Sequence, residues 1–205
     1  MTIKKDVRKQ LLTQRQIMTK EEWQQKSHVI CTALEQAPLV VSARMILAYT
    51  SFRQEPDLMP LMLRLAQGAE GQLSKDFNSG DRVFALPRCE GKSLMWHQWS
   101  PGRSTLNRGA YGILEPDARW PGVDHQHFGS DAILLVPAVG CDRQGYRMGY
   151  GGGFYDRMLS DPVWSSIPKI GIVFDFAYVD LLPTDSWDQP LSGVCTENGL
   201  DLITP

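Results

Sequence analysis

The most constraining feature of the sequence is a continuous apolar run, residues 132–136 (AILLV), which lies between polar and glycine-rich flanks. A short run that is apolar at every position is typical of a strand buried on both faces, as at the centre of a parallel sheet. Parallel strands must be joined by crossover connections, which are usually helices. The run therefore predicts an α/β chain.

The segments on either side of this run alternate between the two patterns. Thr19 and Glu22 form a capping box that starts the second of the predicted helices. Helices are predicted at residues 2–18, 20–36, 58–67 (capped by Asp57) and from about 154, with a candidate helix at 176–182. Strands are predicted at residues 40–48, 82–86 (ending at Pro87), 93–99, 132–136 and 170–174, with a last short element at 194–203.

This alternation predicts one α/β domain over residues 1–205, built on a single open, mostly parallel, twisted sheet with helices on both faces, a Rossmann-like three-layer arrangement. The length of 205 residues and the 42% hydrophobic content suit one such core. In these sheets ligands bind beyond the carboxyl ends of the strands. We therefore expect the site among residues 49–56 and 137–157, which both follow a predicted strand.

Charge and apolar content exclude several classes of protein. With 21% charged residues and a net charge of −2, neither wholesale disorder nor a large nucleic-acid face is expected. No apolar run approaches the roughly 20 residues that span a bilayer, and no apolar segment of a secretory signal follows the basic N-terminus. The four cysteines are far apart and are expected to be free thiols. These features favour a cytoplasmic protein without a membrane partner.

The sharpest functional signal is a loop with four glycines in five positions, residues 149–153. Glycines let backbone N–H groups approach a phosphate without interference from a Cβ atom. Arg147 beside the loop offers a permanent, planar positive charge for phosphate oxygens. Asp156 follows the loop, where a carboxylate either favours the start of a helix or holds a magnesium ion. A connecting turn needs no such charges, so the loop predicts a phosphate site; its spacing fits neither a Walker A loop nor a dinucleotide fingerprint.

The loop lies within a longer motif, residues 136–159 (VPAVGCDRQGYRMGYGGGFYDRML), that resembles the signature of the 5-formyltetrahydrofolate cyclo-ligases. That signature has a strand ending in Pro, followed by Asp-x-x-Gly-x-Arg-x-Gly-x-Gly-x-Gly-Tyr-Tyr-Asp. The matching positions are Pro137, Asp142, Gly145, Arg147, Gly149, Gly151, Gly153, Tyr155 and Asp156. Phe154 replaces the first tyrosine and keeps the aromatic ring.

Other parts of the chain resemble the same family. Lys4 and Arg8 match a basic N-terminal helix that reaches the ATP phosphates, although the residues alone also fit a solvated basic face. Glu55, with Thr50 beside it, matches a glutamate that faces the folate, and its alternative is an ordinary loop acid. Tyr111 lies in a matching Gly-x-x-Gly-Ile-x-Glu-Pro turn, where it either stacks on a flat ring or packs in the core.

Residues 187–192 (WDQPLS) resemble the family's His-Asp-x-Pro-Leu-Asp, with Asp188 at the position associated with magnesium. Trp187 and Ser192 depart from that pattern, so the second metal contact stays open between Asp188 and Asp142.

The resemblance implies an ATP- and Mg²⁺-dependent ligase that cyclises 5-formyltetrahydrofolate, with or without a polyglutamate tail, to 5,10-methenyltetrahydrofolate, releasing ADP and phosphate. It implies catalytic roles for Arg147, Tyr155 and Asp156, folate contacts from Thr50, Glu55 and Tyr111, and magnesium contacts from Asp156 and Asp188. The residues that it assigns to ATP are Lys4, Lys5, Arg8, Arg147, Met148, Gly149, Tyr150, Gly151, Gly152, Gly153, Phe154 and Tyr155. A monomer without a nucleic-acid partner is expected.

Two other functions remain as alternatives. A sugar-phosphate isomerase could share the sheet and the phosphate loop but would need neither ATP nor magnesium. A nucleic-acid-binding module would use the basic N-terminal helix with Trp96, Trp99 and Trp120. Stabilisation by nucleotide tests the first alternative, and a steep salt dependence of oligonucleotide binding tests the second.

Overall fold

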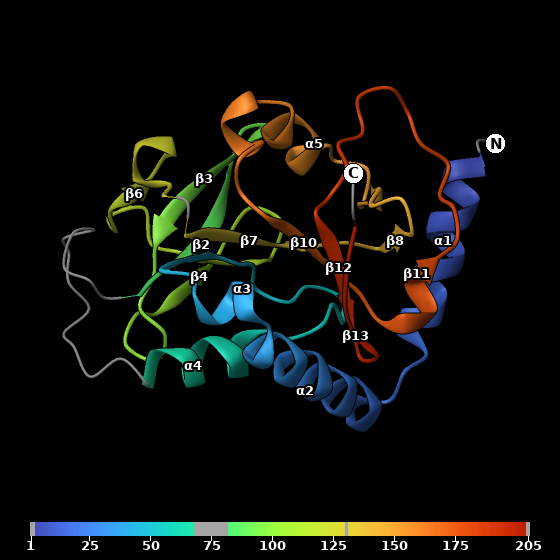
Figure 1. Ribbon diagram of the computed structural model, residues 1–205, viewed down its shortest axis with the longest axis horizontal. Helices are drawn as coiled ribbons and strands as arrows, with labels where there is room; N and C mark the ends of the chain where they lie inside the picture. Colours follow the sequence, from blue (N-terminus) through green and yellow to red (C-terminus); the bar gives the residue numbers. More distant parts are fainter. Residues whose placement is uncertain (1–2, 68–81, 130, 204–205) are drawn as a thin grey trace.

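The fold is built on one mixed sheet of eight strands (Figure 1). The computed structural model describes residues 3–67, 82–129 and 131–203. In spatial order the strands are β13 (Gly199–Leu202), β12 (Gly193–Thr196), β10 (Lys169–Ile172), β7 (Ala132–Pro137), β1 (Met45–Leu47), β2 (Val83–Glu90), β3 (Ser93–Gln98) and β6 (Gly122–Val123). The five strands from β12 to β2 run parallel, whereas β13 pairs antiparallel with β12, β3 with β2, and β6 with β3.

Strand β7 lies inside the parallel part of the sheet, between β10 and β1, as its uniformly apolar sequence predicts. Its side chains alternate between two hydrophobic clusters. Ile133 and Leu135 face one cluster, whereas Leu134 and Val136 face the other. The strand is thus buried on both faces, which explains why no polar residue interrupts it.

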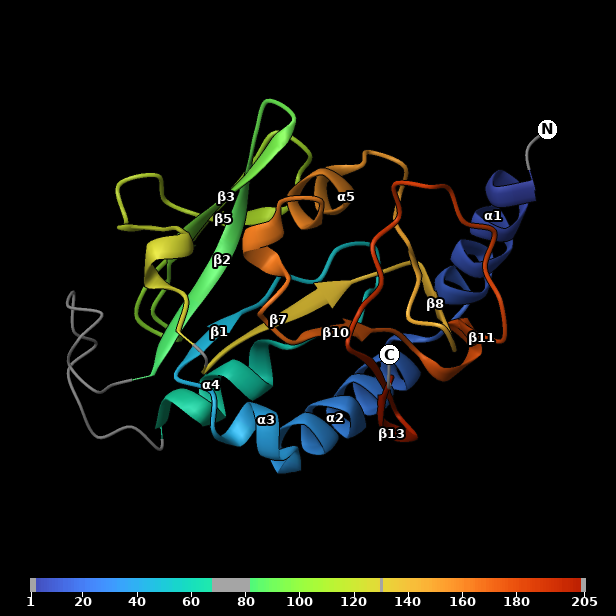
Figure 2. The same ribbon diagram turned by 45° about the horizontal axis from the view of Figure 1, so that its top comes forward.

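Helices cover both faces of the sheet (Figure 2). The helices are α1 (Ile3–Gln16), α2 (Lys20–Gln36), α3 (Pro38–Val41), α4 (Met59–Gln67) and α5 (Phe154–Leu159). Helices α2, α3 and α4 lie together on one face, and α5 lies on the other. Helix α1 lies near the end of the sheet beside β8 (Gly140–Asp142) and β11 (Tyr178–Val179). The predicted layered α/β fold is confirmed.

Local signals predicted the N-terminal helices well. The predicted first residue of α1, residue 2, lies outside the described residues. The Thr19 hydroxyl accepts the Glu22 N–H, and the Glu22 carboxylate accepts the Thr19 N–H, so the capping box is present. Asp57 accepts the N–H of Met59 at the start of α4, as expected of a cap.

Two predicted strands have the wrong bounds. The strand predicted at 40–48 is only β1, because Pro38–Val41 forms a helical turn with Pro38 at its first position, where a proline is favoured. The strand predicted to end at Pro87 continues as β2 to Glu90. Pairing of β2 with β1 stops at Ala85, so a proline beyond that point removes no hydrogen bond to β1.

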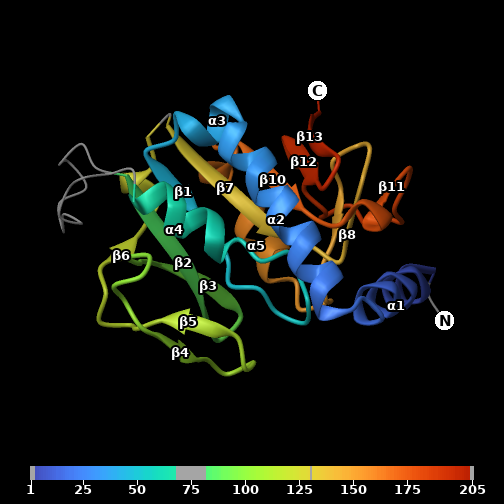
Figure 3. The same ribbon diagram turned by 90° about the horizontal axis from the view of Figure 1, so that it is seen from below.

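The helix predicted at 176–182 is also wrong. Residues Asp175–Ala177 form a 3₁₀ turn, and β11 then pairs with β8. Strand β8 also pairs with β9 (Arg147–Met148), so the three strands form a small second sheet. The remaining small sheet is a hairpin of β4 (Leu106–Arg108) and β5 (Leu114–Pro116), seen from below in Figure 3. Two more 3₁₀ turns are His125–His127 and Pro162–Trp164.

Candidate functional site

The candidate site is a cavity of about 610 Å³ beyond the carboxyl ends of β1 and β7. These strands are parallel neighbours, so the segments that follow Leu47 and Pro137 leave the sheet at the same edge. The cavity walls come from α1, the loop after β1, the β4–β5 hairpin, the glycine loop with α5, and residues 185–188 near the C-terminus.

Every predicted site residue except Lys5 lines this cavity. The lining predicted residues are Lys4, Arg8, Thr50, Glu55, Tyr111, Arg147, Met148, Gly149, Tyr150, Gly151, Gly152, Gly153, Phe154, Tyr155, Asp156 and Asp188. Lys5 is exposed on α1 and is not among the lining residues, because it is turned about 100° around the helix from Lys4.

The glycine loop follows β9 and carries two left-handed glycines. Gly151 has φ +96° and Gly153, directly before α5, has φ +66°. A Cβ atom at Gly153 would lie 2.7 Å from a guanidinium nitrogen of Arg157, so both conformation and space favour glycine there. The loop backbone therefore reaches the cavity with little side-chain bulk.

The main cation of the loop is Arg147, whose side chain is only 4% exposed. Its Nη2 donates to Asp156 Oδ1 at 2.6 Å, and its guanidinium lies 5.2 Å from the Tyr155 ring centroid. Its buried Nε has no hydrogen-bond partner among the described residues. The residue predicted to hold phosphate and the residue predicted to hold magnesium are therefore in direct contact, and both line the cavity.

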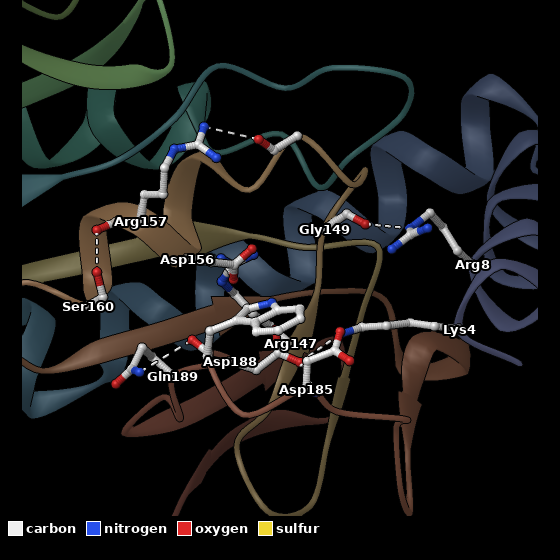
Figure 4. Close-up of polar contacts among 12 residues, drawn as sticks. Lys4, Arg8, Arg147, Gly149, Asp156, Arg157, Ser160, Asp185, Asp188 and Gln189 are labelled. Carbon is white, nitrogen blue, oxygen red and sulfur yellow. Dashed lines mark hydrogen bonds and ion pairs between the residues drawn. The ribbon is translucent and has the colours of Figure 1, made fainter. Parts of the chain in front are cut away.

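A second charged group joins the two ends of the chain (Figure 4). Lys4 Nζ lies 2.7 Å from Asp185 Oδ2 and 2.6 Å from Asp188 Oδ2. Burial acts to lower the pKa of Lys4, but hydrogen bonds and charges from the two aspartates raise it above its ordinary value. Arg8, one turn further along α1, donates to the carbonyl oxygen of Gly149 at 2.8 Å. Helix α1 thus contacts both the glycine loop and the segment with Asp188.

The loop after β1 contributes Glu55 to the cavity wall, an acid that is only 3% exposed. Its Oε2 accepts the N–H of Phe52 at 3.0 Å. Burial raises the pKa of Glu55 to about 7, against the lowering effects of Arg15, the Phe52 N–H and the Tyr150 hydroxyl. The intervening Arg53 and Gln54 have positive φ angles of 48° and 57°, a conformation that non-glycine residues adopt rarely and that often occurs at functional sites.

Thr50 and Tyr111 connect this wall to the β4–β5 hairpin. The Thr50 hydroxyl donates to the Leu114 carbonyl oxygen at 2.6 Å, which holds the hairpin against the loop after β1. Tyr111 is 54% exposed, so the alternative that it packs in the core is wrong. Its ring lies edge-on to Phe154 with centroids 5.6 Å apart. An exposed aromatic ring at the cavity rim is available to contact a flat ligand.

The structure separates the two candidates for the second metal contact. Asp142 is fully buried and accepts the backbone N–H groups of Gln144, Tyr146 and Leu182, so it organises the turn before β9. It does not line the cavity, whereas Asp188 does. Asp188 is therefore the better placed of the two.

Sequence reasoning missed four charged residues at or near the cavity, one of which is Glu115, a buried acid of β5 that lines it. Asp185, which shares Lys4 with Asp188, lies three residues before it in the same acidic segment and could have been noticed. Arg15 lies eleven residues after Lys4, a spacing that returns to the same side of a helix. Arg53 lies within the range 49–56 where the site was expected, but no motif singled it out; it lines the cavity with its guanidinium 5.0 Å from the Phe52 ring centroid.

The set of donors suits a magnesium ion that arrives with phosphate. Among the described residues, no group of three or more His, Cys, Asp or Glu side chains is arranged to hold a metal ion. Mg²⁺ is commonly bound by one or two carboxylates together with waters and substrate phosphates. Asp156 and Asp188 supply two carboxylates in a cavity that also has cations for the phosphates.

Comparison with known proteins decides the family. A family model described as the 5-formyltetrahydrofolate cyclo-ligase family matches residues 1–197. The chain belongs to the 5-formyltetrahydrofolate cyclo-ligase family. Two relatives are named 5-formyltetrahydrofolate cyclo-ligase. The Escherichia coli K12 protein is 30% identical, and the match covers 89% of this chain and 93% of that protein. The Mycolicibacterium smegmatis protein is 31% identical, and the match covers 77% of this chain and 76% of that protein.

Solved structures agree with this assignment. The NMR structure of Aquifex aeolicus 5,10-methenyltetrahydrofolate synthetase superposes with a TM-score of 0.79 at 25% identity, covering 100% of this chain and 94% of its own. The Mycoplasma pneumoniae 5,10-methenyltetrahydrofolate synthetase, at 20% identity and a TM-score of 0.71, shares the fold over 96% of this chain and 99% of its own.

As a member of the cyclo-ligase family, the chain is an enzyme of the ligase class. This family uses ATP as a co-substrate. Of the three tryptophans of the nucleic-acid alternative, Trp96 and Trp99 are buried at 4% and 2% exposure and Trp120 is half-buried, so they form no exposed aromatic surface together. No helix within the described ranges combines the length and apolarity needed to cross a membrane.

Proposed function

We propose that this cyclo-ligase converts 5-formyltetrahydrofolate, ATP and Mg²⁺ into 5,10-methenyltetrahydrofolate, ADP and phosphate. The observation that carries the proposal is one cavity with two different walls. One wall offers glycine backbone, Arg8 and Arg147, which suit a polyphosphate, and the other offers the buried carboxylate of Glu55, which suits a ring bearing N–H groups.

The chemistry explains the need for ATP. The formyl carbon must bond to a second folate nitrogen and lose its oxygen, and oxide or hydroxide is a poor leaving group. In the first step the formyl oxygen attacks the γ-phosphorus of ATP, and ADP leaves. In the second step the N10 nitrogen attacks the activated carbon, loses its proton, and the former formyl oxygen leaves as part of inorganic phosphate.

The protein contributes mainly position and charge to these steps. Arg147 and the loop 149–153 would hold the triphosphate, and Lys4 and Arg8 would clamp it from α1. We propose that α1 closes on the nucleotide and that the whole chain is a single domain. Lys4 and Arg147 now contact aspartates, so phosphate binding would exchange these ion pairs for phosphate contacts. Magnesium, held by Asp156 and Asp188, would neutralise charge on the transferred phosphoryl group.

The folate would occupy the other part of the cavity. A pterin ring presents neighbouring N–H donors, and the Glu55 carboxylate can accept them side by side. We propose that two tyrosines align the substrate. The ring of Tyr111 is exposed at the rim, and the buried hydroxyl of Tyr155 has no partner among the described residues. Thr50 supports this wall through its hydrogen bond to the Leu114 carbonyl oxygen. Excluding water from this region protects the activated formyl carbon from hydrolysis.

We further propose a cytoplasmic monomer without a nucleic-acid or membrane partner. The proposal covers folate with or without a polyglutamate tail, since the cavity rim is open at Tyr111. The test is to mix purified protein with 5-formyltetrahydrofolate, ATP and Mg²⁺, and to follow methenyl product by absorbance and ADP by a coupled assay. One ADP per methenyl product supports the proposal; conversion that does not depend on ATP, or ATP hydrolysis without methenyl product, contradicts it.

A further inference from the structure

Arg15 is a buried cation that the proposed mechanism does not use. It lies near the end of α1 with 0% exposure. Its Nη1 donates to the Tyr150 hydroxyl at 2.9 Å, and its Nη2 donates to the carbonyl oxygens of Ala138 and Val139. Its Nε is buried without a hydrogen-bond partner among the described residues. Burying a guanidinium costs free energy unless a negative charge compensates it.

The acid whose charge interacts with that of Arg15 is Glu55. The two are joined through Tyr150, which accepts from Arg15 and also hydrogen-bonds the Glu55 carboxylate. Tyr150 belongs to the glycine loop and Glu55 to the loop after β1. The contacts therefore run from α1 through the nucleotide wall of the cavity to the folate wall.

The position of Arg15 on α1 gives this arrangement a further consequence. At 100° per residue, Lys4, Arg8 and Arg15 fall within about 40° of one another around the helix. Lys4 and Arg8 contact the nucleotide side of the cavity, and Arg15 contacts the interior beside the folate side. One face of one helix thus serves both halves of the site.

We propose that Arg15 is a positioning residue whose buried charge holds Glu55 in the carboxylate form that the pterin ring requires, linking the nucleotide helix to the folate site. This inference rests on the proposed function and adds a residue to it. Arg15 touches neither substrate in this account, and it acts through Glu55 and Tyr150.

The groups around Glu55 support this role. The groups that interact with it are Arg15 from α1, Tyr49 just after β1, Tyr150 from the glycine loop and Tyr155 from α5, and Arg53 lies two residues before it. Burial raises the pKa of all three tyrosines, so they stay neutral. Arg53 is exposed, so its charge is screened by solvent. Of the described residues that face Glu55, Arg15 is the buried cation.

The test compares pH profiles of kcat/KM for 5-formyltetrahydrofolate at saturating ATP and Mg²⁺ in the parent, Arg15→Gln and a control, Arg64→Gln. Arg64 pairs with Glu35 on the helical face and lies outside the cavity lining. Removing an opposite charge should move the acid limb of Arg15→Gln to higher pH by about 1 unit or more. The folate KM of Arg15→Gln should then be about tenfold above the parental value at about pH 7 and return to it near pH 9. The ATP KM should change less than about threefold. Arg64→Gln should follow the parent.

Two results would overturn the proposal: an acid limb at the parental pH in a folded Arg15→Gln, or an equal loss for both substrates at every pH, which a purely structural role predicts. If Arg15→Gln is too unstable to assay, the double variant with Glu55→Gln decides. Removing both charges should recover part of the lost melting temperature, whereas additive losses contradict the pairing. A parent without ATP-dependent turnover would refute the proposed function instead, and the melting-temperature cycle would still test the pair.

Discussion

Replacing Arg147 by alanine tests the nucleotide wall most sharply. Its guanidinium is almost fully buried and contacts the cavity from beside the glycine loop. A preorganised charge of this kind, aimed at a transferring phosphoryl group, contributes roughly 3 kcal/mol or more to transition-state stabilisation. By that magnitude kcat/KM should fall at least about 100-fold in Arg147→Ala.

The structure adds a competing explanation that must be separated. Arg147 also neutralises Asp156 at 2.6 Å, so its loss could act only by leaving that carboxylate unpaired. Asp156 is 26% exposed and can regain water, which limits that effect. The double variant Arg147→Ala/Asp156→Asn removes both charges. The reference is Asp156→Asn alone, assayed like the double variant at saturating Mg²⁺. If Arg147 acts on the phosphates, the double variant stays well below Asp156→Asn, whereas equal rates for the two would mean that Arg147 acts only by neutralising Asp156.

The assay is the initial rate of methenyl product formation across ATP concentrations, with melting temperature and circular dichroism as checks of folding. Arg143→Ala is the matched control, because Arg143 lies in the same stretch but packs on Tyr178 at 4.5 Å and lines no part of the cavity. It should stay within about threefold of the parent. A folded Arg147→Ala with near-parental kcat/KM, or a double variant that recovers parental turnover, would refute a direct role for Arg147.

Three further predictions concern other walls of the cavity. Lys4→Gln should raise the KM for ATP at least about fivefold and the KM for folate far less. The control is Lys9→Gln, which should change neither KM because Lys9 is exposed on α1. Equal changes in both KM values of Lys4→Gln would contradict the clamp. Asp156→Asn should raise the Mg²⁺ concentration for half-maximal rate about tenfold or more, and a titration that overlays the parent's would exclude Asp156 as a ligand. Because burial raises the pKa of Glu55 from 4.5 to about 7, the stability that its protonated form gives is present below about pH 4.5 and is lost as the pH rises through 7. The free energy of unfolding of Glu55→Gln, relative to the parent, should therefore increase by about 3 kcal/mol between about pH 4 and pH 8, and a constant difference would show that Glu55 is not perturbed.

The parts of the fold that the sequence predicted are those set by local signals. The apolar run of β7, the capping box at Thr19 and the glycine loop before α5 each depend on neighbouring residues. One error was local, since the turn that begins at Pro38 shortens the strand predicted at 40–48, and the other two come from long-range pairing. Strand β2 continues through Pro87 because β3 pairs with it there, and β11 forms because β8 lies beside it.

The candidate site divides in the same way. Residue types and spacing identified the cations and acids, and the family resemblance gave them roles. The actual contacts could not be predicted, since Lys4 and Asp188 are separated by 184 positions and meet only in the folded chain. The burial of Glu55 and its electrostatic interaction with Arg15 likewise arise between segments that are far apart in the sequence.

Transfer of the formyl oxygen is the most direct measure of the proposed reaction. The substrate would be 5-formyltetrahydrofolate labelled with ¹⁸O in the formyl group, converted by the purified protein with unlabelled ATP and Mg²⁺ in unlabelled water. Mass spectrometry of the released phosphate should show one ¹⁸O atom for each methenyl product. Phosphate without label, formed at the same rate as the methenyl product, would contradict phosphorylation of the formyl oxygen.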